Sequence, residues 1–133
     1  MAVKKPLPPL SETHLEIMNV IWDRKEATVA EVWAAVSARR PVARNTVLTL
    51  MTRLAAKGWL RHRPDGNTFR YAAAVPRQSA VGGMVSRLVD TAFAGSTENL
   101  VMALLDSRGV SSEEAARIRD RIAREGDERR VKS

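Results

Sequence analysis

One side of a predicted helix over residues 43–57 carries short polar and cationic side chains that suit contact with a nucleic acid. Asn45, Thr46 and Thr49 are candidates for base-edge or methyl contacts, and Arg44 and Arg53 could reach a guanine or a phosphate. A plain surface helix more often carries Glu and Lys at such positions. We therefore expect this side of the helix to be covered by a ligand, with DNA as the candidate.

Three more arginines follow the helix in a short predicted strand pair. Arg61, Arg63 and Arg70 would lie around the rim and tip of this pair. Because Lys and Arg supply most of the affinity for DNA by neutralising phosphates, these residues are expected to touch the backbone or the minor groove.

Each candidate also has a structural interpretation. Asn45 could cap its helix, since Ala43 is a poor cap, and Thr46 could bond to the local backbone. The hairpin arginines could be ordinary solubilising residues of an edge strand.

Catalytic chemistry finds little support in this chain. Its two histidines, His14 and His62, lie far apart in different predicted elements, and it contains no cysteine. No metal-ligand spacing, glycine-rich phosphate loop or G-x-S-x-G motif is present. We predict a protein that is not an enzyme and has no metal and no cofactor.

The polar helix must be held by its opposite side. Val47, Leu50, Met51 and Leu54 recur at i, i+3, i+4 and i+7, which places them on one face of a helix. The helix is predicted to end at Gly58, which can take the left-handed conformation.

A β-hairpin is expected to follow directly. Residues 59–63 and 68–73 alternate in side-chain character around the turn-forming residues 64–67. Leu60, Phe69 and Tyr71 are predicted to pack back on the helices. This order, helix and then basic hairpin, is typical of a winged helix.

Two earlier helices complete the predicted domain. Ser11 can cap the first, which is expected to end near residues 23–25, and Thr28 with Glu31 forms a capping box for the second. Their inward residues are predicted at helical spacing: His14, Ile17, Met18 and Ile21 in the first, with Leu15 and Trp22 widening the stripe, and Val29, Val32, Trp33 and Val36 in the second. The three tryptophans, Trp59 included, are interpreted as core.

Beyond residue 75 the pattern predicts three more helices with wide apolar stripes. These 53 residues are few for an independent core, so a second copy is expected to cover them, with packing on the first half as the alternative. The expected dimerisation residues are Val85, Leu88, Val89, Leu100, Val101, Leu104, Leu105, Ile118 and Ile122. The predicted fold is thus mainly α with a small β-hairpin wing: a winged helix-turn-helix domain (1–75), a C-terminal three-helix dimerisation region (76–126) and a polar, frayed tail (127–133).

The charge is concentrated in the first part of the chain. Residues 1–80 hold 13 Lys/Arg against 6 Asp/Glu, whereas residues 81–133 hold 9 against 9. Such asymmetry indicates that one part meets a polyanion. The absence of cysteine, of an apolar run long enough to span a membrane and of a signal peptide in the Pro-rich first ten residues favours a cytoplasmic protein without membrane contact.

The sequence resembles the BlaI/MecI penicillinase-repressor family. The matching motifs are residues 10–22, 28–32, 44–54, 57–60 and 69–71, within a resemblance that covers residues 10 to about 75 closely and continues more loosely to about 125. It implies a homodimeric bacterial transcriptional repressor that binds a palindromic double-stranded DNA operator and leaves when a regulatory protease cleaves its dimerisation region.

Two departures from the family pattern bear on regulation. The copper-responsive members use C-terminal cysteines, and this chain has none. The penicillinase repressors are cleaved at an Asn-Phe bond, and the loosely matching position here is Ala103-Leu104.

Two other functions are compatible with these features. A ligand-sensing regulator of the MarR kind would need an apolar pocket between the two halves. A non-specific basic RNA-binding protein would use the hairpin and first helices, although it would lack the surface aromatic residues that stack unpaired bases.

Overall fold

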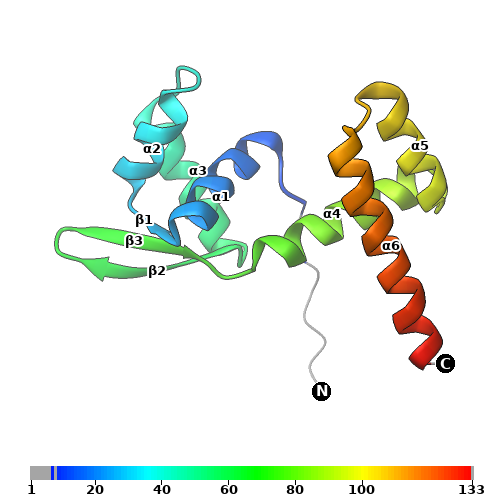
Figure 1. Ribbon diagram of the computed structural model, residues 1–133. Coiled ribbons are helices and arrows are strands. Elements are labelled where there is room, and N and C mark those ends of the chain that lie inside the picture. The colour runs from blue at the N-terminus through cyan, green and yellow to red at the C-terminus, as the bar shows by residue number, and fades with distance from the viewer. Residues whose placement is uncertain (1–6, 8, 133) are drawn as a thin grey trace. The chain divides into compact units, whose positions relative to one another are not determined.

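The computed structural model describes residue 7 and residues 9–132, with side chains as far as residue 127 (Figure 1). Most of the Pro-rich start and the last residue of the predicted polar tail lie outside these described residues. The elements in chain order are α1 (Glu12–Arg24), β1 (Glu26–Ala27), α2 (Val29–Ser37), α3 (Arg44–Ala56), β2 (Leu60–Asp65), β3 (Thr68–Ala73), α4 (Arg77–Ala92), α5 (Thr97–Ser107) and α6 (Ser112–Lys132).

A small antiparallel sheet lies against the first three helices. Its strand order is β1-β3-β2, and Figure 1 shows α1, α2 and α3 on one side of it. The predicted hairpin is therefore confirmed, and the third strand, β1, is an addition. The hairpin turns through Gly66 and Asn67, with Gly66 at φ 62, the positive φ that a two-residue hairpin loop requires at its first position.

The register of the sheet separates two sets of side chains. Leu60 lies opposite Ala73 and His62 opposite Tyr71, so these residues share the face toward the helices. Arg63 lies opposite Arg70 on the other face. Pro64 occurs within β2, where an edge strand tolerates its missing N–H.

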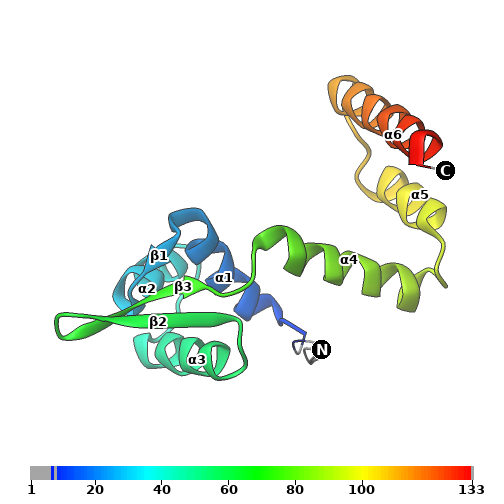
Figure 2. The same cartoon turned by 90° about the horizontal axis from the view of Figure 1, so that it is seen from below.

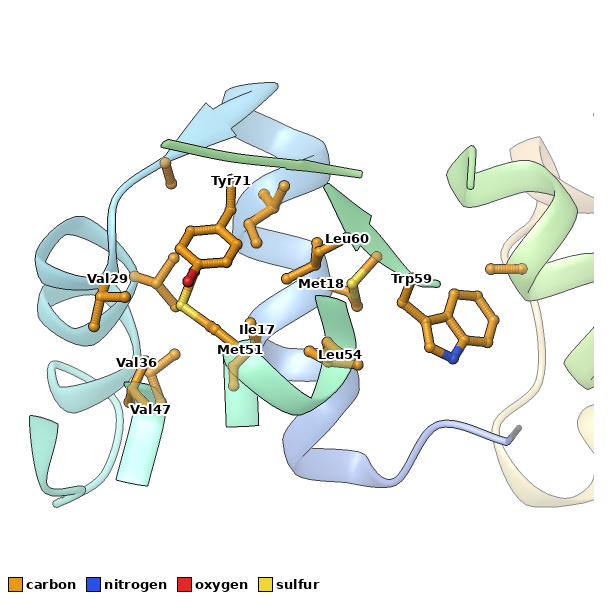
Figure 3. Close-up of a cluster of buried hydrophobic side chains, with 14 residues drawn as sticks. Ile17, Met18, Val29, Val36, Val47, Met51, Leu54, Trp59, Leu60 and Tyr71 are labelled. Carbon is orange, nitrogen blue, oxygen red and sulfur yellow. The ribbon is translucent and has the colours of Figure 1, made fainter. Parts of the chain in front are cut away.

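A single apolar core joins the helices to the sheet. Ile17, Met18 and Ile21 of α1 and Met51 of α3 are completely buried, and Tyr71 extends among them from β3 (Figure 3). The inward stripes predicted for α1 and α3 are confirmed. The complete buried set is Ile17, Met18, Ile21, Ala27, Val29, Val32, Val36, Val47, Met51, Leu54, Trp59, Leu60, Tyr71 and Ala80.

Two aromatic residues predicted to lie inward are exposed instead. Trp33 is 37% exposed because its indole N–H reaches out to the Val42 carbonyl at 2.9 Å, over the turn that precedes α3. Phe69 is 45% exposed near the hairpin tip, where its ring packs edge-to-face against the His62 ring at 4.8 Å between centroids.

The start of α4 is fixed to α1 by polar contacts. The Trp22 indole N–H donates to the Val75 carbonyl at 2.9 Å, and the Arg77 guanidinium lies over the same indole ring. Arg77 also pairs with Asp23 at 2.6 Å, and Ala80 is buried in the core. The chain divides into two compact units within α4, between Val85 and Ser86.

The second unit has almost no interior of its own. Not one of residues 86–127 is buried, although α5 and α6 carry many large apolar side chains. Hydrogen bonds between Ser111 and Glu114 form a capping box at the start of α6.

The frayed tail expected from Gly126 is not observed, because α6 continues to Lys132. A single glycine costs a helix only about 1 kcal/mol relative to alanine, and the Glu and Arg residues after it are good helix formers.

Candidate nucleic-acid interface

The polar side of α3 is fully open. Asn45, Thr46, Thr49 and Arg53 are exposed and line one shallow hollow together with Leu50. Figure 2 shows α3 running beside β2. Asn45 also lines a second hollow, together with Asn67, Thr68 and Phe69 of the hairpin. The structure brings together the residues expected to contact base edges.

The polar groups on this side of α3 are free to bind a ligand. Among the described residues, Asn45, Thr46 and Thr49 form no side-chain hydrogen bond, so neither the capping role of Asn45 nor the local role of Thr46 is observed. Thr52 differs, because its hydroxyl donates to the Leu48 carbonyl at 2.8 Å.

The N-terminus of α3 is suited to an anion. The N-cap residue is Ala43, which offers no side-chain acceptor to the first-turn amides, and the first turn contains no acidic residue. The amide of Thr46 bonds back to the Ala43 carbonyl. Free amides at the positive end of the helix dipole favour a phosphate, and Arg44 adds a full charge beside them.

Further cations gather near the other end of α3. Arg53 and Lys57 form no ion pair with any described residue, and both lie close enough to His14 of α1 to influence its titration. Burial lowers the pKa of His14, and the charges of Lys57 and Arg53 lower it further. His14 also completes the α1 capping box, where its Nδ1 accepts the Ser11 backbone N–H at 3.4 Å.

Two of the three hairpin arginines are held by carboxylates of the protein itself. Arg63 makes a two-point contact with Glu26 of β1, with both N–O distances at 3.1 Å. The hydrogen bond from Arg63 lowers the pKa of the Glu26 carboxyl. This pair joins the two outer strands of the sheet.

Arg70 lies between two acidic side chains. Its Nε donates to Asp65 at 2.7 Å, and its Nη1 donates to Glu31 at 3.3 Å. The same Glu31 oxygen accepts the Thr28 backbone N–H at 2.8 Å, the bond that chiefly lowers the pKa of Glu31. Arg70 therefore connects the hairpin to the capping box of α2.

Arg61 is the hairpin arginine that remains free. Its side chain makes no ion pair or hydrogen bond with the residues that the structure describes. The sequence prediction grouped the three arginines together. It missed the Arg63–Glu26 and Arg70–Glu31 pairs because each glutamate lies more than thirty positions earlier, and it also missed Asp65, which lies only five positions before Arg70.

An apolar part of this surface was also missed. Leu48 is 44% exposed on α3, one turn after Arg44, and it shares an open hollow with Phe69 of the hairpin. The signal was available, because the spacing i, i+4 places Leu48 beside the polar residues at the start of α3.

The geometry offers little for other chemistry. Within the described part of the chain, no three His, Asp or Glu residues come together as a metal site. None of the helices searched there has the length and apolar character needed to cross a bilayer.

A three-helix core with an antiparallel wing, an uncapped polar helix and unpaired cations around it defines a winged-helix DNA-binding protein. Comparison with known proteins identifies the family within this class. Residues 10–124 match the family of the penicillinase repressor. The chain belongs to this BlaI/MecI family of DNA-binding transcriptional repressors, which are not enzymes.

Individual relatives agree with this assignment. The chain is 33% identical over 113 residues to the transcriptional regulator BlaI of Mycobacterium tuberculosis, covering 84% of this chain and 82% of that protein. It is 26% identical to the penicillinase repressor of Bacillus licheniformis, covering 83% of this chain and 86% of the relative. The solution structure of the DNA-binding domain of the repressor BlaI is 31% identical, with a TM-score of 0.51, covering 56% of this chain and 90% of that one.

Proposed function

We propose that the protein represses transcription as a homodimer on a palindromic operator, with α3 of each copy in the major groove. The observation that carries this proposal is the polar side of α3, whose side chains are exposed and lack partners within the described protein. A helix of 13 residues spans about 20 Å, a length that fits the groove.

The roles of the individual residues follow from the absence of hydrogen-bond or ion-pair partners for their side chains within the described protein. Asn45, Thr46 and Thr49 would contact base edges, and Arg44 and Arg53 would bind guanine or phosphate. Arg61 would contact the backbone beside the groove.

Arg63 and Arg70 have a different role in this proposal from the direct contact first expected. Because each is already bound to a carboxylate, they would hold the hairpin in position next to α3. Their effect on DNA binding would therefore be indirect.

The second unit supports the dimer. Leu104 is 48% exposed and Ile122 66% exposed, and residues 86–127 include no buried residue that could form a core. Exposed apolar surface on this scale favours contact with another chain. A second copy satisfies this need if the nine residues expected at the interface cover one another across a twofold axis.

Sedimentation and selection from random duplexes test this proposal together. The full chain should sediment as two 14.7 kDa copies and enrich a palindrome whose half-sites lie about 10 base pairs apart or a small multiple of that. Preference for this site over random duplex should be about 10³-fold or more. A monomer, or equal binding to RNA, would refute the proposal.

A pair of variants in α5 isolates the dimer contact. Leu104→Glu places a charge in the apolar surface and should shift the protein to monomer with loss of operator binding. Asn99→Glu places the same charge on an exposed polar position of the same helix and should change neither property. Loss of dimer in both variants would mean that any added charge destabilises α5.

Release from DNA forms the last part of the proposal. The penicillinase repressors are cleaved at an Asn-Phe bond, and the loosely matching position here, Ala103-Leu104, lacks that bond and lies inside α5, so a protease could act there only after this helix opens. The mass of the protein recovered from derepressed cells tests this. Full-length protein would indicate a different releasing signal.

A further inference from the structure

The exposed side chain of Leu48 differs in chemistry from its neighbours on α3. It follows Arg44 by one turn and Asn45 by three residues, so it lies within the surface expected to face the bases. Leucine can neither donate nor accept a hydrogen bond. A single exposed leucine is ordinary on most surfaces, but this one lies on α3 close to Arg44 and Asn45, whose side chains are suited to polar contacts.

The hollow beside Leu48 is lined by both apolar and polar residues. Val29, Tyr71 and the exposed Phe69 contribute the apolar atoms together with Leu48. Arg44, Asn45, Asn67 and Thr68 contribute the polar groups. Such an arrangement suits a small apolar group carried on a polar, negatively charged molecule.

The major groove presents one apolar group of this kind. Thymine carries a 5-methyl group there, and this methyl separates it from cytosine, which offers an amino donor. Contact with leucine removes both apolar surfaces from water, whereas cytosine would leave its amino group facing a side chain that cannot accept a hydrogen bond.

We propose that Leu48 determines specificity by reading the 5-methyl group of one thymine in each operator half-site. This inference rests on the proposed function, because α3 must lie in the major groove for Leu48 to reach a base. The partner of Leu48 is the thymine methyl group, and contact with a second copy of the chain is the alternative that the experiment excludes.

Deoxyuridine provides a probe that removes only this methyl group. Duplexes enriched by the full-length protein are synthesised with each thymine of one half-site replaced by uracil in turn. One position should weaken binding by about fourfold, the equilibrium equivalent of losing one buried methyl group. Fluorescence anisotropy at constant salt measures the change.

Leu48→Ala provides the second arm of a double-mutant cycle. Alanine is a better helix former than leucine, and Leu48 is outside the buried core, so the variant should fold normally as judged by its thermal melt. Its affinity for the thymine and uracil duplexes should be equal at the sensitive position. Val110→Ala removes an equally exposed apolar side chain elsewhere and should retain the fourfold difference.

The possible results distinguish a failure of the role of Leu48 from a failure of the proposed function. If no palindrome is enriched, the proposed function itself fails. If a palindrome is enriched but uracil has no effect at any thymine, or its effect persists in Leu48→Ala, the role of Leu48 is wrong. A change of oligomeric state in Leu48→Ala would assign this side chain to contact between copies and would also overturn the inference.

Discussion

The contrast between Arg61 and Arg70 gives a direct test of how the hairpin meets DNA. Arg61 is free, whereas Arg70 is held by Asp65 at 2.7 Å and Glu31 at 3.3 Å. If Arg70 turned toward a phosphate, Asp65 would lose its ion pair beside the DNA, and Glu31 would keep only its contacts with Thr28 and Arg24. We therefore expect Arg61→Gln to remove a phosphate contact and Arg70→Gln to remove none.

The salt dependence of binding measures this difference. Each phosphate contact contributes about 0.9 to the slope of the logarithm of the binding constant against the logarithm of salt concentration. Arg61→Gln should reduce the magnitude of the slope by this amount, so that a fourfold rise in salt costs the variant about threefold less than it costs the native protein. Arg70→Gln should keep the native slope and lower the unfolding temperature instead.

Anisotropy titrations on one duplex at several salt concentrations supply these slopes, with thermal melts of the same samples as a check on folding. Glu26→Gln serves as a reciprocal variant, because it releases Arg63 and should make the slope steeper. An equal loss of slope in Arg61→Gln and Arg70→Gln would refute the reasoning, since Arg70 would then exchange its carboxylates for phosphates.

Three further changes test the interface, the core and the titration of one histidine. Arg53→Ala should weaken operator binding by about 1 to 3 kcal/mol in a titration and leave the unfolding temperature unchanged; a lower temperature would make Arg53 structural. Met51→Ala removes a completely buried side chain and should lower the free energy of unfolding in urea by about 2 to 5 kcal/mol, whereas a change below ~1 kcal/mol would contradict its place in the core. Because the pKa of His14 is lowered from 6.5 in the folded state, the unfolded chain binds more protons just below pH 6.5, and the free energy of unfolding should fall as the pH drops from 6.5 toward the folded pKa. His14→Gln should remove this part of the pH dependence, and its persistence would exclude His14 as the source.

The predicted elements were those specified by residues close together in sequence. The caps at Ser11 and Thr28 involve a partner three residues away, so both helix starts could be located in advance. The strand β1 could not, because its two residues show no alternation and become a strand only by pairing with Ala72 and Tyr71 of β3. The exposure of Trp33 and Phe69 likewise depends on where neighbouring elements end.

The candidate site shows the same limit. The helical period alone separates the buried Val47 and Met51 from the exposed Asn45 and Thr49. The period says nothing of Arg70, whose partner Glu31 lies 39 residues earlier in another element. The sequence predicted which residues of α3 belong to the candidate site and which face of the helix they occupy. The tertiary structure was needed to tell a free cation from one that is paired with a carboxylate.

The lack of buried residues between positions 86 and 127 has a consequence for how much of the protein a cell maintains. If a second copy completes this unit, its folding is tied to association, and its melting temperature should rise with protein concentration while that of the winged helix should not. Dilute chains would then spend more time open to proteases and be degraded faster. The population of repressor would decline steeply below a threshold of synthesis, so that a modest fall in expression could free the promoter without any inducer.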